Sequence, residues 1–280
     1  MIKTNQLLYC IFFLILLFGC NNDDVVDTPD EPVIKTTKLR VLTYNIFGAR
    51  EGGVSASDLT EIANVIKRIN PHLVALQEVD VNTKRTGVDR NIAKELAALC
   101  GMEYFFAKAM NFDGGEYGDA VLSKLPVKAT RAYNMSILPA YGGELRSVAQ
   151  IKIEINNQEM YFMSTHLDHK YEENRKYQSN QLLKILESLD LPFIIGGDFN
   201  AEPDAESVKM LYDKLNFACQ QNCKQYKTFP ATKPNSTIDY IMSSKSPDLT
   251  VDYYGVESWA TTQSDHLPVY AIYNVITNSP

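Results

Sequence analysis

One short segment constrains this chain most, residues 193–200, which read FIIGGDFN. A brief apolar run that breaks into two glycines predicts a buried strand with polar groups at its C-terminal end. In an extended chain the side chains of Asp198 and Asn200 point to the same side, so both can address one phosphate, one metal ion or one metal-bound water. The alternative for this pair is an Asx-turn that leaves the strand, because Asp and Asn are common turn formers.

The N-terminus predicts export. Lys3 precedes an unbroken apolar run over residues 11–18, which is too short for a comfortable membrane span and is typical of a signal peptide. Residues 17–20 read LFGC and resemble the bacterial lipobox, in which the cysteine, here Cys20, is acylated and becomes the mature N-terminus. A non-lipidated signal peptide and an anchor helix are the alternatives.

These features divide the chain into three parts. We predict a lipoprotein signal peptide over residues 1–19, a flexible tether over residues 20–37 and one domain over residues 38–280, since no Pro/Gly/Ser-rich linker interrupts the rest. The predicted protein is a monomeric outer-membrane lipoprotein on the periplasmic or cell-surface side, attached to the membrane through its N-terminal lipid.

The acidic charge balance bears on possible partners. The chain has 27 Lys and Arg against 34 Asp and Glu, and residues 1–19 hold one lysine and no acid, which leaves 26 against 34 and a net charge of −8. Binding to a phosphate backbone ordinarily relies on clustered Lys and Arg. The charge therefore disfavours an avid nucleic-acid binder, but it allows a hydrolase that contacts one phosphate locally.

The cysteines point to an oxidising compartment. Cys219 and Cys223 are four residues apart and can form a disulfide in the periplasm or remain thiols, while Cys100 is left single. A zinc site is disfavoured, because the chain has no second closely spaced cysteine pair and four histidines in all.

Hydrophobic periodicity predicts an α+β domain. Long helices do not follow every strand, so two packed mixed sheets with helices outside fit the order better than a parallel α/β fold. Helices are expected over residues 57–69, 89–100, 171–189 and 207–215. Strands are expected over residues 38–47, 73–79, 103–110, 118–123, 127–135, 145–155, 159–166, 193–198, 237–242, 251–256 and 267–275.

Polar side chains recur where these strands end, which suggests one shared rim of the sheets. A carboxylate, Asp239, also lies inside an otherwise apolar run. The strand-end residues are Asn45, Glu78, His166 with Asp168, Asp198 with Asn200, and Asp265 with His266.

Seven short motifs carry a resemblance to the endonuclease/exonuclease/phosphatase superfamily of metal-dependent phosphoesterases. They follow the family order from about residue 39 to residue 273. The resemblance implies a four-layer α-β-β-α sandwich with the active site where the strand ends of both sheets meet. The motifs are TYN at 43–45, LQEV at 76–79, YGDAVLS at 117–123, STHLD at 164–168, GGDFNA at 196–201, IDYI at 238–241 and SDHLPV at 264–269.

The resemblance also implies a metal site. Glu78 takes the place of the principal magnesium ligand, with Asn45 and Asp265 beside it. Carboxylate and carbonyl oxygens suit Mg²⁺, with Mn²⁺ as the alternative. Asp198 then orients and deprotonates the attacking water, and Asn200 binds the phosphate.

Two histidines complete the implied catalytic set. His266, held by the Asp239 carboxylate, stabilises the developing charge or moves a proton, and His166 binds the scissile phosphate from the other side. Arg146 either reaches the phosphate or forms a surface salt bridge.

Other polar residues near the rim are candidates for the substrate. Arg85 and Tyr117 lie after strands at the expected rim and are candidate substrate contacts. Asp119 occupies a position where relatives commonly carry asparagine, so it either faces away from the phosphate or touches the metal shell.

The leading hypothesis is an extracytoplasmic, Mg²⁺-dependent phosphomono- or phosphodiesterase whose substrate is a small or lipid-linked phosphoester. A nuclease that degrades extracellular DNA is the enzymatic alternative. A non-catalytic binding protein that uses the same fold is the alternative from another class.

Overall fold

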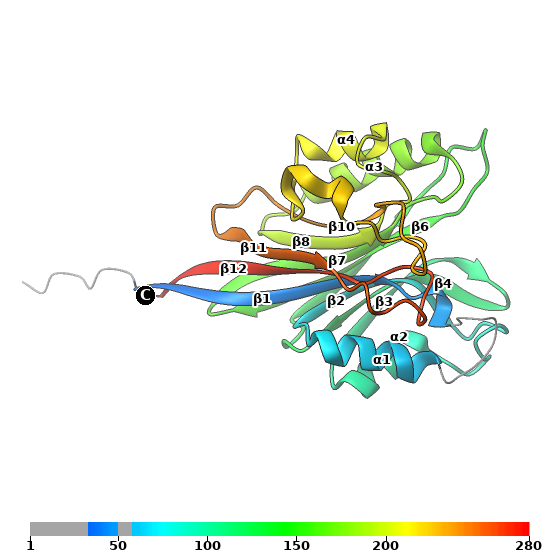
Figure 1. Ribbon diagram of the computed structural model, residues 1–280, viewed down its shortest axis with the longest axis horizontal. Coiled ribbons are helices and arrows are strands. Elements are labelled where there is room, and N and C mark those ends of the chain that lie inside the picture. The colour runs from blue at the N-terminus through cyan, green and yellow to red at the C-terminus, as the bar shows by residue number, and fades with distance from the viewer. Residues whose placement is uncertain (1–32, 50–57, 280) are drawn as a thin grey trace, which may run out of the picture. The chain divides into compact units, whose positions relative to one another are not determined.

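Two β-sheets pack face to face between two layers of helices (Figure 1). The computed structural model describes residues 33–49 and 58–279, so the predicted signal peptide and Cys20 lie outside the described residues. Strand β1 begins at Val33, and the residues from 33 to 37 that were assigned to the tether are therefore part of the strand. No helix in the described part of the chain is long and apolar enough to cross a membrane.

The first sheet has the strand order β11-β12-β1-β2-β4-β3. Only β1 and β2 pair in parallel, and the other neighbours are antiparallel, so the sheet is mixed as predicted. Its strands are β1 (Val33–Asn45), β2 (Leu73–Val81), β3 (Glu103–Phe112), β4 (Gly115–Ser123), β11 (Leu249–Val256) and β12 (Val269–Ser279).

The second sheet has the order β5-β6-β7-β8-β10-β9 and is mixed in the same way, with β7 and β8 as its parallel pair. The short strand β9 was not predicted from the sequence. The strands are β5 (Ala129–Met135), β6 (Arg146–Ile155), β7 (Gln158–His166), β8 (Phe193–Asp198), β9 (Asn216–Phe217) and β10 (Asp239–Ser243).

Helices cover the outer face of each sheet, which confirms the four-layer α-β-β-α arrangement (Figure 1). Helices α1 (Asp58–Ile69) and α2 (Ile92–Cys100) cover the first sheet, and α3 (Glu172–Glu187) and α4 (Glu206–Tyr212) cover the second. Helix α2 begins three residues later than predicted, because the Asn91 side chain caps it by accepting from the backbone N–H of Lys94. It ends at Cys100, as predicted, and Gly101 caps it in the left-handed conformation.

The two glycines before Asp198 let β8 approach its neighbours closely. A Cβ added at Gly196 would lie 2.8 Å from Cβ of Thr43 in the opposing sheet. A Cβ added at Gly197 would lie 2.4 Å from the carbonyl oxygen of Thr165. Neither position has room for a side chain, so the glycines bring the end of β8 against β1 and β7 and fix where Asp198 emerges.

The structure also settles the state of the cysteines. Cys219 and Cys223 are joined by a disulfide, with Cα atoms 4.9 Å apart, and Cys100 is free. The disulfide lies in a 3-10 helix (η3, Gln220–Gln225) and its N-cap, beside α4 and β9.

Candidate active site

Glu78 lies in a bulge of β2. The pairing of β2 with β4 shifts register between Leu76 and Val79, and Glu78 has a φ of 58°. A strand end was predicted at this position, but β2 continues to Val81. A left-handed conformation is costly for a residue with a Cβ, and it turns the carboxylate out of the ladder toward the rim.

Asn45 connects Glu78 with Asp198. Its Nδ2 donates to Glu78 Oε1 at 3.1 Å and to Asp198 Oδ2 at 3.0 Å. Its Oδ1 accepts a hydrogen bond from the backbone N–H of Phe47 at 3.1 Å, so the amide oxygen is already engaged. The geometry therefore favours Asn45 as a residue that positions two carboxylates over the predicted role as a direct metal ligand.

Asp198 is at the centre of the site and is 1% exposed. Its Oδ1 accepts from the backbone N–H of Asn200 at 2.8 Å, which is the Asx-turn considered as the alternative for this pair. Asn200 has a φ of 49° and is not extended, yet its side chain reaches His166, with Nδ2 2.8 Å from Nε2. The turn and the shared site are therefore both present.

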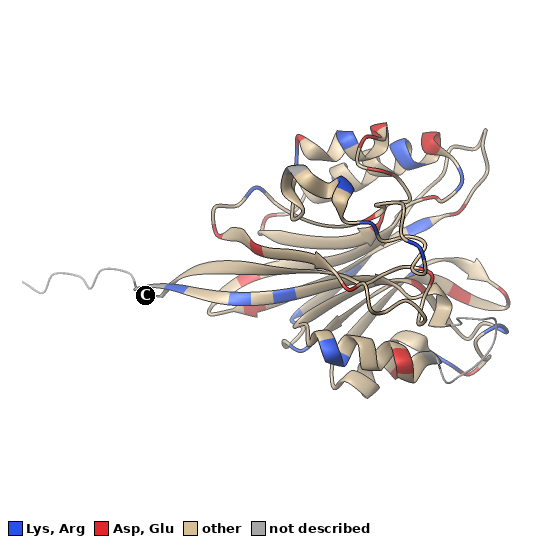
Figure 2. Cartoon of the chain, in the orientation of Figure 1, with Lys and Arg blue, Asp and Glu red and all other residues tan. Residues whose placement is uncertain are grey.

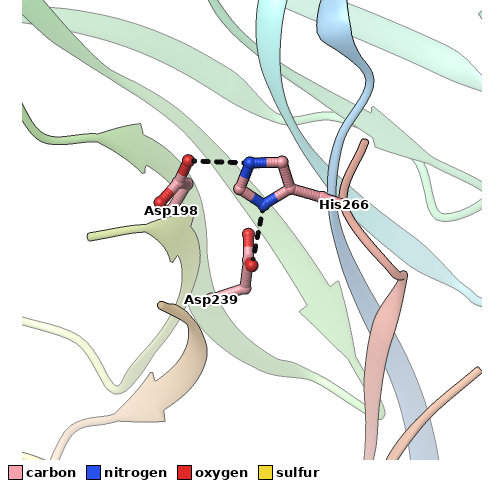
Figure 3. Close-up of side chains that lie close together, drawn as sticks. All are labelled: Asp198, Asp239 and His266. Atoms are coloured by element: carbon pink, nitrogen blue, oxygen red, sulfur yellow. Dashed lines mark hydrogen bonds and ion pairs between the residues drawn. The ribbon is translucent and has the colours of Figure 1, made fainter. Parts of the chain in front are cut away.

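His266 is held between two carboxylates, as Figure 3 shows. Its Nδ1 donates to Asp239 Oδ2 at 2.9 Å, and its Nε2 lies 3.6 Å from Asp198 Oδ2. Burial lowers the pKa of His266, but Asp239 and Asp198 together raise it to about 10. The imidazole is thus a cation at neutral pH, with its Nε2–H aimed at Asp198.

For Asp198, burial outweighs the neighbouring charges in setting the pKa. Burial raises its pKa to about 7, against the lowering effects of His266 and of its hydrogen bonds. A carboxyl group whose pKa lies near neutrality is well suited to act as a general base.

His166 is a neutral imidazole beside the same carboxylate. Burial, Arg146 and His266 hold its pKa well below the usual range. Its Nδ1 lies 3.3 Å from Arg146 Nη1 and its Nε2 lies 2.8 Å from Asn200 Nδ2, so each ring nitrogen faces a donor, and Nε2 is also 3.4 Å from Asp198 Oδ2.

Arg146 supplies a buried cation to the site. Its side chain is 1% exposed, and it contacts Glu144 through an ion pair of 2.8 Å between Nη2 and Oε2. Its Nε has no hydrogen-bond partner among the described residues. A surface salt bridge was the alternative interpretation for Arg146, and the burial is inconsistent with it. A buried guanidinium with a free N–H is suited to binding a phosphate oxygen.

Asp119 lies behind Arg146 and does not line the cavity. Ser147 Oγ lies 2.6 Å from Asp119 Oδ2 and 2.9 Å from the carbonyl oxygen of Ala107, but a hydroxyl has one proton. If Ser147 donates to Ala107, then Asp119 must donate to Ser147. Burial raises the pKa of Asp119 to about 8, against Ser147 and Arg146, which agrees with a neutral carboxylic acid.

These residues open onto one cavity of about 350 Å³. Nine of the predicted site residues line it, and Asn45 and Asp239 lie behind it as hydrogen-bond partners of lining residues. The nine are Glu78, Arg85, Tyr117, Arg146, His166, Asp198, Asn200, Asp265 and His266.

Six further residues line the cavity and were not predicted. Glu144 lies two positions before Arg146, and His169 follows the predicted STHLD motif, so both had a local sequence signal. The other four are apolar and had no such signal; two of them lie on β3, one in the 3-10 helix after β1 (η1, Phe47–Ala49) and one in the segment before β10. They are Phe47, Met110, Phe112 and Phe229.

Arg85 is less available than predicted. It forms two hydrogen bonds with Asp80, of 2.6 and 2.7 Å, and its guanidinium lies 4.4 Å from the ring centroid of Phe112 and 5.7 Å from that of Tyr117. Its charge is therefore paired, and it contributes a flat surface to the cavity wall.

Asp168, just after β7, holds backbone groups in place and does not line the cavity. Its carboxylate accepts from the backbone N–H groups of Lys170, Tyr171 and Glu144. It thereby ties the start of α3 to the loop that leads to Arg146.

The donor set fits a divalent cation. Glu78 and Asp265 line the same cavity, and burial raises the pKa of both carboxyl groups, with the charge of Asp265 acting on Glu78. Two partly buried carboxylates that line one cavity are stabilised by a bound cation, and their oxygens suit Mg²⁺. Asp198, Asp239 and His266 also offer ligand atoms within 4.8 Å of one another and could hold a metal ion, but the His266 ring already bridges the two carboxylates.

Sequence and structure comparisons agree with this architecture. The sequence profile of the Endonuclease/Exonuclease/phosphatase family matches residues 42–266, and the chain belongs to this family. Members of this family are hydrolases that act on phosphoester bonds. No curated protein matches the chain.

Solved structures share the fold. An endonuclease/exonuclease/phosphatase family protein from Bacteroides thetaiotaomicron is 21% identical over 86% of this chain and 99% of its own, with a TM-score of 0.68. The mannosyl-6-phosphatase of the same species is 19% identical over 85% of this chain and 99% of its own, with a TM-score of 0.68. The catalytic domain of human Nocturnin, with bound sulfate, is 20% identical over 88% of this chain and 98% of its own, with a TM-score of 0.65.

Proposed function

We propose that this protein hydrolyses a small phosphoester with the help of a divalent cation, Mg²⁺ or Mn²⁺. The observation that carries the proposal is the position of Asp198. It is buried, contacts Asn45, His166 and His266, and faces the same cavity as the carboxylates of Glu78 and Asp265. One cavity thus holds a candidate base, a candidate cation site and donors for a phosphate.

The proposed chemistry follows from these contacts. Asp198 accepts a proton from the attacking water, and the His266 cation stabilises the charge that develops on the phosphate. Arg146 and Asn200 donate to phosphate oxygens. A cation held by Glu78 and Asp265 would neutralise phosphate charge when bound.

The size of the cavity and the charge of the protein favour a small substrate. A volume of about 350 Å³ is at the low end of the range for small-molecule sites, roughly 300–1,000 Å³. The net charge of −7 disfavours avid binding to a long polyanion. The similarity in fold to a mannosyl-6-phosphatase is compatible with a phosphomonoester, with DNA hydrolysis as the alternative.

The test is a substrate panel assayed with residues 21–280. The substrates are bis-p-nitrophenyl phosphate, p-nitrophenyl phosphate, hexose phosphates, inositol phosphates, sphingomyelin and plasmid DNA, each with Mg²⁺, with Mn²⁺ and with EDTA. Asp198→Asn is the test variant, and Asp213→Asn, at an exposed aspartate just after α4, is the matched control. We expect turnover that EDTA and Asp198→Asn each abolish and that the control retains.

Three results would overturn the proposal. Turnover that survives both EDTA and Asp198→Asn would contradict the mechanism, and plasmid cleavage without hydrolysis of small esters would establish the nuclease alternative. Metal-independent binding of a phosphoester with no turnover would indicate a binding protein.

We also propose an outer-membrane location through acylation of Cys20. The support is the sequence pattern around residues 17–20. Cys20→Ser should move the protein from the membrane fraction to the soluble fraction of the cell, and an unchanged distribution would contradict lipidation.

A further inference from the structure

Five side chains from β1, α1, β11, β12 and the segment after β11 form a strip that runs from the first sheet to helix α1. The ring of Tyr253 stacks on that of Tyr270, with centroids 5.1 Å apart, and the Arg40 guanidinium lies 5.9 Å from the Tyr270 centroid. Arg40 Nη1 donates to the backbone carbonyl of Ile69 at 2.6 Å. The neighbouring Arg68 guanidinium lies 3.9 Å from the ring centroid of Trp259. We call these five residues the aromatic–arginine strip.

The strip lies beside the layer of helices that covers the first sheet. Its Tyr270 packs against the apolar cluster beneath α1 and α2, to which β11 contributes no described residue. Tyr253 on β11 is 47% exposed, and Trp259, just after β11, is 36% exposed. Both belong to a short set of large apolar side chains that the surface exposes.

The two arginines have no acidic partner. Within the described ranges, neither Arg40 nor Arg68 has a carboxylate within ion-pair distance, and Nε of Arg40 has no hydrogen-bond partner. Asp252 pairs with Lys38 at 2.9 Å, and Glu257 accepts a hydrogen bond from the indole N–H of Trp259, which leaves its negative charge beside the strip. Figure 2 shows further basic residues along β1 and on α1, although the whole chain is acidic.

We propose that the aromatic–arginine strip binds an anionic lipid surface. Tyr and Trp prefer the boundary between apolar chains and water, and each basic residue near an anionic leaflet contributes attraction. The long arginine stems can lie along apolar surface while their charged ends meet the headgroups. Unneutralised cations beside exposed amphipathic rings match this chemistry.

The geometry disfavours a single-stranded nucleic acid in the same place. Bases stack on free aromatic faces, but Tyr253 and Tyr270 cover each other and Arg68 covers one face of Trp259. The ring edges and guanidinium N–H groups remain, and these suit phosphate headgroups at a membrane surface.

The course of the chain is compatible with such docking. Strand β1 carries Arg40 and begins at Val33, 13 residues after Cys20. A segment of that length spans at most about 45 Å when extended, so a lipid on Cys20 would hold the start of β1 within that distance of the bilayer. This last support rests on the proposed lipidation, whereas the contacts of the strip do not.

The test uses unlipidated protein, residues 21–280, which contains the whole compact unit Val33–Pro280. Flotation is measured with vesicles of phosphatidylcholine alone and with vesicles that contain about 30% phosphatidylglycerol, at low salt and at about 0.5 M NaCl. We expect binding to the anionic vesicles that high salt weakens. Absence of binding to anionic vesicles at low salt would overturn the proposal.

A pair of matched double variants assigns the binding to the strip. Arg68→Gln/Trp259→Ala should weaken binding at least roughly fivefold, since one basic residue near an anionic surface contributes about 1 kcal/mol. Lys209→Gln/Tyr177→Ala removes one cation and one exposed ring from the α3–α4 layer and should change binding less than twofold. Equal effects of the two double variants would overturn the assignment.

Two further readouts distinguish lipid binding by the strip from misfolding and from nucleic-acid binding. Both double variants should keep the thermal unfolding midpoint and the phosphoesterase activity of the wild type, so loss of activity alone would concern the proposed function instead. The contrary outcome is that the wild type binds a thymidine oligonucleotide and not the vesicles. If Arg68→Gln/Trp259→Ala then abolishes the oligonucleotide binding, the lipid assignment is overturned in favour of a nucleic acid.

Discussion

Asp119→Asn should stabilise the protein, and more so as the pH rises. The carboxyl group is fully buried, its Oδ1 has no hydrogen-bond partner, and its pKa is about 8 in the folded protein against an ordinary 3.8. Between these two values the folded protein holds a proton that the unfolded chain releases. Stability therefore falls as the pH rises from about 4 to about 8 and then levels off.

The magnitude follows from this difference. At pH 7 the pH exceeds the ordinary pKa by about 3, which corresponds to about 4 kcal/mol as an upper bound. Relaxation of the site reduces this loss of stability. The cost of an unmatched buried polar group in proteins is about 1–3 kcal/mol, so we expect the ionised Asp119 to destabilise the fold by about 2 kcal/mol. Asparagine keeps the shape, donates from Nδ2 to Ser147 and has no titration, so it should avoid this cost.

The assay is unfolding in urea and by heat from pH 4 to pH 9 in metal-free buffer. Asp119→Asn should match the wild type near pH 4 and exceed it by about 2 kcal/mol near pH 8, or about 4–8 °C in Tm. Asp213→Asn, at an exposed position, is the control and should show no such trend. A variant less stable than the wild type at pH 8 would refute the argument, because it would mean that Asp119 is ionised and paired with Arg146.

Three further predictions concern the proposed reaction. Asp239→Asn removes the first of the charges that raise the pKa of His266, so the alkaline limb of kcat/KM should move to lower pH and the rate should fall at least roughly 100-fold; an unchanged profile would contradict the pairing. Arg146→Lys keeps the charge but loses the planar fork, and inhibition by inorganic phosphate should weaken about tenfold with little change in fold; equal inhibition would show that Arg146 does not meet the phosphate. Asn45→Ala should weaken activation by Mn²⁺ about 10–100-fold and recover at high metal, whereas Glu78→Ala should not; the reverse order would make Asn45 the principal ligand.

The sequence alone predicted much of the architecture. In the part of the chain that the structure describes, apolar runs and helical periods located the four α-helices and every strand except β9, because burial on one face imposes a period that the local sequence reveals. The order of the elements also favoured two mixed sheets over a parallel fold. Exact limits differed by a few residues, as at α2, where the Asn91 cap decides the start.

The sequence also placed the chemistry at the strand ends. The double glycine before Asp198 was visible as a break in an apolar run, and the structure gives the reason, since the opposing Thr43 and the neighbouring Thr165 leave no room for a Cβ. The resemblance across seven motifs predicted which polar residues would meet, and most of them line one cavity, with Asn45 and Asp239 behind it.

Only the tertiary structure decided how each polar group is oriented and charged. The amide of Asn45 turns its oxygen toward Phe47, and Arg85 is neutralised by Asp80, because neighbours in space compete for the same atoms. Protonation of Asp119 likewise depends on burial, which has no sequence signature. Local sequence determines which residues reach the rim, whereas packing from distant strands determines what each of them can do there.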